Sequence, residues 1–179
     1  MKKHGKIINN LTYFKKVVTD LQDLVSNEEK YIVKLDDQKN FINNIKSQMK
    51  VEDGILTLDG GIIITYNYRI ISEVSNWDDL PTLWAYLLNS IEELVEEGKS
   101  EFYFPSQPIN VTLDIYKNDK SKLDFKIENK GFIVGYKTFI QEVLKRAEEF
   151  FNILVYELNL VKYDYELKQI EKIRMIYNL

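Results

Sequence analysis

The chain has 179 residues, 45% of them hydrophobic and 29% charged, and a formal net charge of −4. This length suits one domain with a sizeable core, and the composition is too apolar for a disordered chain. Because there is no cysteine, disulfides, zinc–thiolate sites and a cysteine nucleophile are excluded.

The charge is distributed unevenly along the chain. Residues 1–50 carry ten lysines and six acidic side chains, whereas residues 51–104 carry two basic and eleven acidic side chains. The basic start lacks the apolar run of a signal peptide, and the longest apolar stretch, Ile62–Ile64, is too short to span a bilayer. We therefore expect a soluble, cytoplasmic protein without membrane contact.

Helical spacing dominates the first fifty residues. Apolar residues recur three or four positions apart in two series, namely Leu11, Phe14, Val18, Leu21 and Val25, then Ile32, Leu35, Ile42, Ile45 and Met49. One helix over residues 11–49 would be about 58 Å long, against a domain diameter of about 40 Å. Ser26 and Glu29 have the spacing of a capping box, which predicts a second helix starting there. A hairpin broken near Ser26 is favoured over a projecting arm, because interrupted heptads would make a poor coiled-coil seam.

The period then changes from helical to alternating. Residues 55–58 and 62–71, separated by Asp59-Gly60-Gly61, predict a β-hairpin with its turn at the two glycines. The next segment predicts the clearest helix, with Asp78 or Asp79 as its cap, Pro81 in its first turn and Gly98 at its end.

A short strand, three longer strands and a terminal helical region follow. Residues 102–104 predict a short strand, and residues 109–115, 123–127 and 132–137 predict an antiparallel sheet with one dry face. Thr138 and Gln141 have the spacing of a second capping box, and the helical pattern over 138–179 predicts a bend between Asn159 and Asp164.

Together these segments predict an α+β fold in one domain, 1–179. Residues 1–50 would form a helical N-terminal segment, and residues 51–179 an α+β core. The predicted order is αα-ββαβββα-α, with helices on one face of a largely antiparallel sheet of five or six strands.

No catalytic motif is present. His4 is the sole histidine, so histidine-based triads and two-histidine metal sites cannot be assembled, and no glycine-rich phosphate loop occurs. The sequence therefore predicts no cofactor and favours a protein without enzymatic activity. The alternative is an enzyme that uses carboxylates, with or without a divalent metal.

The best-defined polar feature is acidic. Four glutamates crowd the C-terminal turns of the predicted central helix and a fifth follows it, namely Glu92, Glu93, Glu96, Glu97 and Glu101. Carboxylates at a helix C-terminus oppose the helix dipole, and like charges four residues apart repel each other. The five glutamates form either a solvated surface neutralised by lysines such as Lys99 or a docking surface for a basic partner.

Two weaker features complete the search. The segment 102–108 is either an aromatic recognition edge or a short strand that buries two rings and ends at Pro105. The isoelectric point of about 5.2 argues against nucleic acid as a ligand. The sequence is most consistent with a protein-interaction module, one version being a bacterial immunity or antitoxin-type protein that covers a basic toxin.

Overall fold

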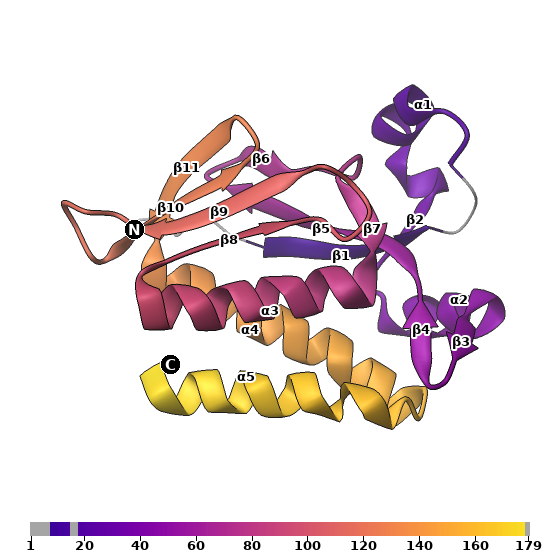
Figure 1. Ribbon diagram of the computed structural model, residues 1–179. Helices are drawn as coiled ribbons and strands as arrows, with labels where there is room; N and C mark the ends of the chain where they lie inside the picture. Colours follow the sequence, from indigo (N-terminus) through magenta and orange to yellow (C-terminus); the bar gives the residue numbers. More distant parts are fainter. Residues whose placement is uncertain (1–7, 15–17, 178–179) are drawn as a thin grey trace.

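A computed structural model of the chain describes residues 8–14 and 18–177, which form an α+β fold (Figure 1). The helices are α1 (Leu21–Ser26), α2 (Gln38–Gln48), α3 (Leu80–Glu97), α4 (Tyr136–Asn152) and α5 (Asp164–Tyr177). The strands are β1 (Ile8–Phe14), β2 (Ile32–Lys34), β3 (Lys50–Glu52), β4 (Ile55–Thr57), β5 (Asp59–Tyr66), β6 (Arg69–Ser72), β7 (Trp77–Asp79), β8 (Lys99–Tyr103), β9 (Asn110–Ile115), β10 (Lys122–Ile127) and β11 (Lys130–Gly135).

The strands of the described residues pair antiparallel throughout, as predicted, but they are divided among three sheets. A five-stranded sheet has the order β2-β1-β5-β6, with β7 also paired to β5. A four-stranded sheet has the order β11-β10-β9-β8, and β3 with β4 forms a separate hairpin. Strands β6 and β11 approach each other, and Lys130 bonds Glu73 at 2.8 Å, so the two larger sheets adjoin along these edges.

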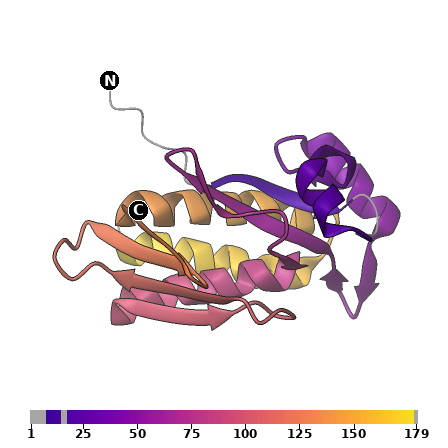
Figure 2. The ribbon, with the colours of Figure 1, turned by 90° about the horizontal axis from the view of Figure 1, so that it is seen from above.

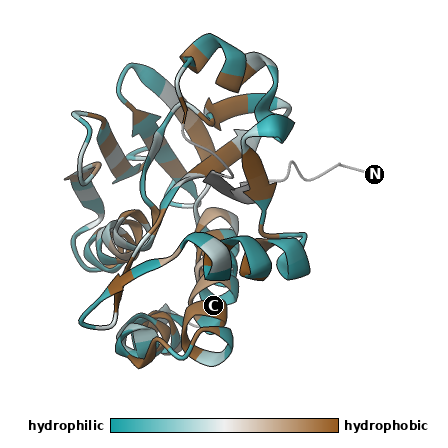
Figure 3. Cartoon of the chain, turned by 90° about the vertical axis from the view of Figure 1, so that its right-hand side faces the viewer, coloured by the Kyte–Doolittle hydropathy of each residue, from teal (hydrophilic) through white to brown (hydrophobic). Residues whose placement is uncertain are grey.

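Helices α3, α4 and α5 form two layers beneath the sheets (Figure 1). Helices α3 and α4 pack against the strands, and α5 packs against both of them on the side away from the sheets (Figures 1 and 2). In Figure 3 the central strands are largely hydrophobic, whereas the helices alternate between hydrophobic and hydrophilic residues. The helices are therefore amphipathic, and α3 lies between the sheets and α5.

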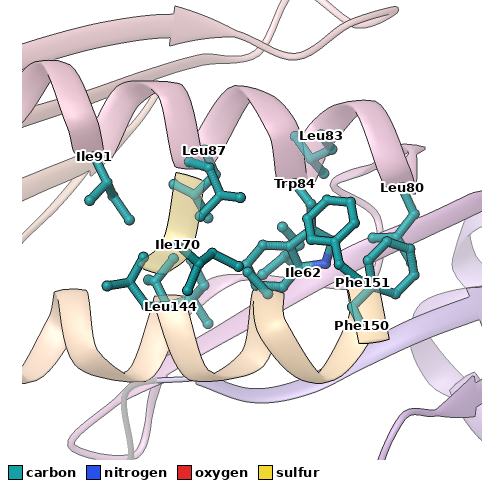
Figure 4. Packing of buried hydrophobic residues seen from close by; sticks show 14 of the residues in the cluster. Ile62, Leu80, Leu83, Trp84, Leu87, Ile91, Leu144, Phe150, Phe151 and Ile170 are labelled. Atoms are coloured by element: carbon teal, nitrogen blue, oxygen red, sulfur yellow. The ribbon is translucent and has the colours of Figure 1, made fainter. Parts of the chain in front are cut away.

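The core is centred on the apolar stripe of α3. Figure 4 shows Leu83, Trp84 and Leu87 of this helix meeting residues of α4 and α5. An aromatic chain extends this core, because the Phe150 ring lies edge-on to Phe41 of α2 at 6.5 Å and to Phe151 at 5.3 Å. The N-terminal helix α2 is thereby joined to the main hydrophobic cluster.

The predicted alternation in β9 and β10 is confirmed. Val111 and Leu113 of β9 are buried, as are Leu123, Phe125 and Ile127 of β10, while Asp114 and Lys126 are exposed. The buried positions of both strands share the sheet face that lies against the helices.

The prediction for the N-terminal segment is wrong. In place of a helical hairpin over residues 11–49, the chain forms strand β1, the short helix α1, strand β2 and helix α2. Residues 15–17 lie outside the described part of the chain, and α1 ends at Ser26, where the capping box predicted a start. The physical reason is tertiary, since β1 pairs with β2 on one side and with β5 on the other.

The predicted hairpin turn at Asp59-Gly60-Gly61 is also wrong. These residues open β5, where Gly60 pairs with Tyr13 of β1 and with Asp78 of β7. The turn that joins β5 to β6 is instead at Asn67 and Tyr68, both with positive φ. A separate hairpin, unpredicted, joins β3 to β4 through Asp53 and Gly54.

The C-terminal half agrees with the predicted bend. Helix α4 passes into a π-helical turn, Ile153–Glu157, and the chain changes direction at Asn159, where φ is 55°, before α5 begins at Asp164. The helix start predicted from the capping box at Thr138 is wrong, because α4 begins two residues earlier, at Tyr136. None of the described helices combines the length and the hydrophobicity needed to cross a membrane.

Candidate functional site

Helix α3, which carries four of the five predicted site residues, is fixed at both ends by its sequence. Asp79 caps the start, since its carboxylate accepts hydrogen bonds from the amides of Thr82 at 3.3 Å and Leu58 at 2.9 Å. Gly98 ends the helix in the left-handed conformation, with φ of 79°, and its amide donates to Leu94 O. These predicted ends are confirmed, and they determine where the glutamates lie.

Glu92 is engaged inside the molecule. Its carboxylate accepts a hydrogen bond from Gln169 Nε2 at 2.7 Å and forms an ion pair with Lys172, both residues of α5. The bond from Lys172, followed by that from Gln169, lowers the pKa of Glu92 below its ordinary value. Glu92 therefore holds α5 against α3 and has little capacity left for a partner.

Glu93, Glu96 and Glu97 are exposed. Together with Glu92, Asn89 and Lys99 they line a shallow open depression at the C-terminal end of α3. Within residues 8–14 and 18–177 none of the three exposed carboxylates forms an ion pair. We refer to Glu93, Glu96 and Glu97 as the acidic surface of α3.

The acidic surface faces two directions. Glu96 lies toward α5, where it contributes, after Glu92, to the raised pKa of Lys172. The opposite flank is marked by Ser90, whose hydroxyl lies 2.7 Å from that of Ser100 in β8. Because Glu93 and Glu97 follow Ser90 by three and seven residues, they lie on the flank beside β8.

The fifth predicted residue, Glu101, lies elsewhere. It is exposed on β8, opposite Thr112 of β9, and accepts a hydrogen bond from the Asn110 side chain. The neighbouring Ser100 faces α3, so the Glu101 side chain points to the sheet face away from the helices. The structure thus brings four of the predicted site residues together and separates Glu101 from them.

The electrostatics of the acidic surface are unfavourable for the helix itself. The last turn of α3 contains no basic residue, so its carboxylates meet the negative end of the helix dipole uncompensated from within the helix. Each such exposed charge costs roughly 0.3–1 kcal/mol. A local rule that is broken on an exposed surface is typical of a position under functional demand.

A second group of carboxylates is structural. Asp59 of β5 lies directly opposite Asp79 of β7, and burial, followed by the charges of Asp79 and Asp78, raises the pKa of Asp59. Asp78 is buried and accepts hydrogen bonds from the amides of Ser106 at 2.8 Å and Asp79 at 2.7 Å. In the described residues no three or more His, Cys, Asp or Glu side chains are grouped so as to hold a metal ion.

The aromatic segment 102–108, which begins within β8, is held in place. Phe102 and Phe104 stack with ring centroids 6.5 Å apart, while Tyr103 between them is 56% exposed. Ser106 bonds Asp78, and the Gln107 side chain donates to Trp77 O. The interpretation as a short strand is confirmed in part, because β8 ends at Tyr103, before Pro105, and of the two rings Phe104 is buried and Phe102 partly buried, while Tyr103 is exposed.

The sequence did not indicate the residues that determine which of these glutamates is bonded internally and which lie beside β8. Gln169 and Lys172 bond Glu92 from 77 and 80 residues away, so no local pattern indicates the contact. The row Tyr86, Ser90, Glu93 and Glu97 is visible as helical spacing, but only the contact between Ser90 and Ser100 shows which strand it faces.

Comparison with known proteins gives no relative. No protein-family model matches the sequence, and neither a curated protein nor a solved structure shows significant similarity to it. Any function must therefore be argued from the surface described above.

Proposed function

We propose that the protein is a non-enzymatic, cytoplasmic interaction module that binds a basic protein partner through the acidic surface of α3. The observation that carries this proposal is that Glu93, Glu96 and Glu97 are exposed without ion pairs at the helix end where negative charge is least favourable. A lysine- or arginine-rich partner would relieve that repulsion on binding.

Charge would act chiefly on the rate and specificity of this encounter. Complementary surface charges accelerate association and exclude partners of the same sign, and salt weakens the effect. The large rigid core beneath α3 supports the proposal, since a surface held in one shape loses little entropy on binding. One concrete version is neutralisation of a basic toxin, in the manner of immunity and antitoxin proteins.

The test is affinity capture from the native host with three baits. These are the full chain, the charge-reversed variant E93K/E96K/E97K, and the control E52K/E128K/E157K, which reverses three exposed glutamates outside α3. We expect a stoichiometric basic protein on the first and third baits, released by salt, and its loss on the second.

A stoichiometric partner held equally by all three baits would overturn the proposal, as would an acidic partner or the absence of any partner. Circular dichroism of each bait establishes that binding is compared between folded proteins. Because the control changes net charge by the same amount as E93K/E96K/E97K, it separates the acidic surface from the charge of the whole molecule.

A further inference from the structure

We propose that the partner binds by adding an extended, basic segment to the free edge of β8, as a fifth strand of the four-stranded sheet. This inference rests on the proposed function and deepens it, since it identifies the conformation of the partner and the second half of the binding surface. It is carried by the hydrogen-bond register of β8 and by the flank of α3 that lies beside it.

The register shows which backbone groups of β8 are available. Phe104 N donates to Ile109 O at 3.0 Å, and Ile115 N donates to Gly98 O at 2.9 Å, so the even-numbered residues of this edge are those bonded to β9. In an antiparallel pair the intervening residues direct their amide and carbonyl groups away from the neighbour. The backbone amide and carbonyl groups of Lys99, Glu101 and Tyr103 therefore point to the open edge.

This edge differs from the other strand edges described. Strand β8 is the terminal strand of its sheet and has five residues, whereas the edges β6 and β11 lie against each other. Strands β2 and β7, which are also edges of the five-stranded sheet, have only three residues each. A row of unpaired amide and carbonyl groups is a template for one more strand.

Helix α3 supplies the charges beside this template. β8 reverses direction after Gly98 and runs back along α3 (Figure 1). The contact of Ser90 with Ser100 shows which flank of α3 lies beside β8. Tyr86, Glu93 and Glu97 lie on the same helical row as Ser90. A strand added to β8 would thus place alternate side chains toward Glu93 and Glu97, and the others on the outer face beside Glu101.

Two exposed aromatic rings border the same edge. Tyr103 is 56% exposed at the end of β8, and Tyr86 is 41% exposed on the helical row that faces it. Tyrosine provides a large contact area at low entropic cost and is common at the centres of interfaces. These rings supply apolar contact, while the carboxylates supply selection for positive charge.

The same charges argue against a second copy of this chain as the occupant. Pairing β8 with itself would bring Glu101 and the flanking Glu93 and Glu97 of two copies together, and like charges placed directly opposite are destabilising. The negative charge beside β8 attracts a basic strand and repels the same edge of a second copy of the chain. The occupant is therefore an extended segment rich in lysine or arginine.

The experiment uses two synthetic peptides of equal charge on the full ¹⁵N-labelled chain. Ac-(Lys-Thr)₄-NH₂ can pair as a strand, and Ac-(Lys-Pro)₄-NH₂ lacks half of the amide donors and favours an extended helix. We expect the Lys-Thr peptide to slow amide exchange of Glu101 and Tyr103, while Ser100 and Phe102, already bonded to β9, change little. We expect the Lys-Pro peptide to leave the exchange of Glu101 and Tyr103 unchanged.

Two variants complete the test. E93K/E97K should weaken binding of the Lys-Thr peptide by at least about tenfold, the effect of losing one close charge pair. The control E52K/E157K, which reverses two exposed glutamates elsewhere, should bind like the parent protein. Tyr103→Pro removes an outward amide without touching a bond to β9, and it should abolish the protection of Glu101.

The outcomes separate this inference from the proposed function. If both peptides bind equally and the amides of Glu101 and Tyr103 exchange as before, strand addition is overturned while charge-based docking survives. If E93K/E97K binds as well as the parent, the acidic surface is not the site and both proposals fail. Protection of these amides without peptide, together with a dimer in sedimentation, would assign the edge to a second copy and overturn the basic occupant.

Discussion

Truncation of Phe150 to alanine tests the core that supports the acidic surface. The ring is fully buried on α4 and lies edge-on to Phe41 of α2 at 6.5 Å and to Phe151 at 5.3 Å. Removing it therefore affects α4 and also the contact that joins the N-terminal helix to the remainder of the core.

The expected cost follows from these contacts. A buried Phe→Ala substitution costs roughly 3–5 kcal/mol, and each lost edge-on aromatic pair adds about 0.5–1.5 kcal/mol beyond the buried area. The loss of two such pairs places the cost of Phe150→Ala at the upper end of this range, about 5 kcal/mol. For a domain of this size, about 2–4 °C per kcal/mol corresponds to a fall in melting temperature of roughly 10–20 °C.

Urea unfolding, followed by tryptophan fluorescence and circular dichroism together, measures this cost. Tyr156→Ala, which removes an aromatic ring that is 68% exposed, is the matched control and should change stability by less than about 0.5 kcal/mol. A double-mutant cycle with Phe41→Ala should give a coupling energy of about 0.5–1.5 kcal/mol. A loss below about 1 kcal/mol for Phe150→Ala would refute the assignment of this ring to the core.

Three further predictions concern α3. Gly98→Ala should cost about 1–2 kcal/mol in thermal melts, because φ is 79° and a Cβ meets nothing within 4 Å, so only backbone strain is added; an unchanged melting temperature would contradict this. Because the folded pKa of Glu92 is lowered, its contribution should be present above pH 4.5 and lost as pH falls through the folded pKa, so the stability gap between Glu92→Gln and the parent should shrink from pH 7 to pH 3 in urea unfolding. E93K/E97K should be at least as stable as the parent but slower to associate with a basic partner at low salt, and equal association rates would count against docking at α3.

The sequence was a reliable guide at the ends of α3, in β9 and β10 and at the bend before α5, but not at the capping boxes of Ser26 and Thr138. Asp79, Pro81 and Gly98 mark the ends of α3 in the order that backbone chemistry requires, and the alternation in β9 and β10 follows from one face being buried. The bend before Asp164 could be predicted because one apolar stripe ends and another begins there.

The N-terminal region could not be predicted in this way. Leu11 and Phe14 fit a helical period, yet they belong to a strand whose two neighbours come from residues 32–34 and 60–64. Such distant pairing overrides a local period. Gly60 and Gly61 misled for a related reason, since glycine marks a turn but also a strand position approached closely by its neighbours.

The candidate site was predicted in part. Glutamates spaced by three or four residues indicate one face of a helix, but the spacing does not show which carboxylate is used internally. Glu92 is bonded by Lys172, whereas Glu93 and Glu97 face β8, and both facts depend on tertiary packing. Likewise the free edge of β8 follows from the strand order of the whole sheet.

The insertion of β1 between β2 and β5 has a consequence for the order in which the chain folds. Tyr13 pairs with Gly60 and Ile8 with Ile64, so the five-stranded sheet must close a long loop before it gains a central ladder. Strands β8 to β11 follow one another through short connections and need no such closure. Since non-local pairing is slow, pulse-labelled amides of β9 and β10 should be protected before those of β5, and a nascent chain would carry β1 without its second neighbour until β5 had been synthesised.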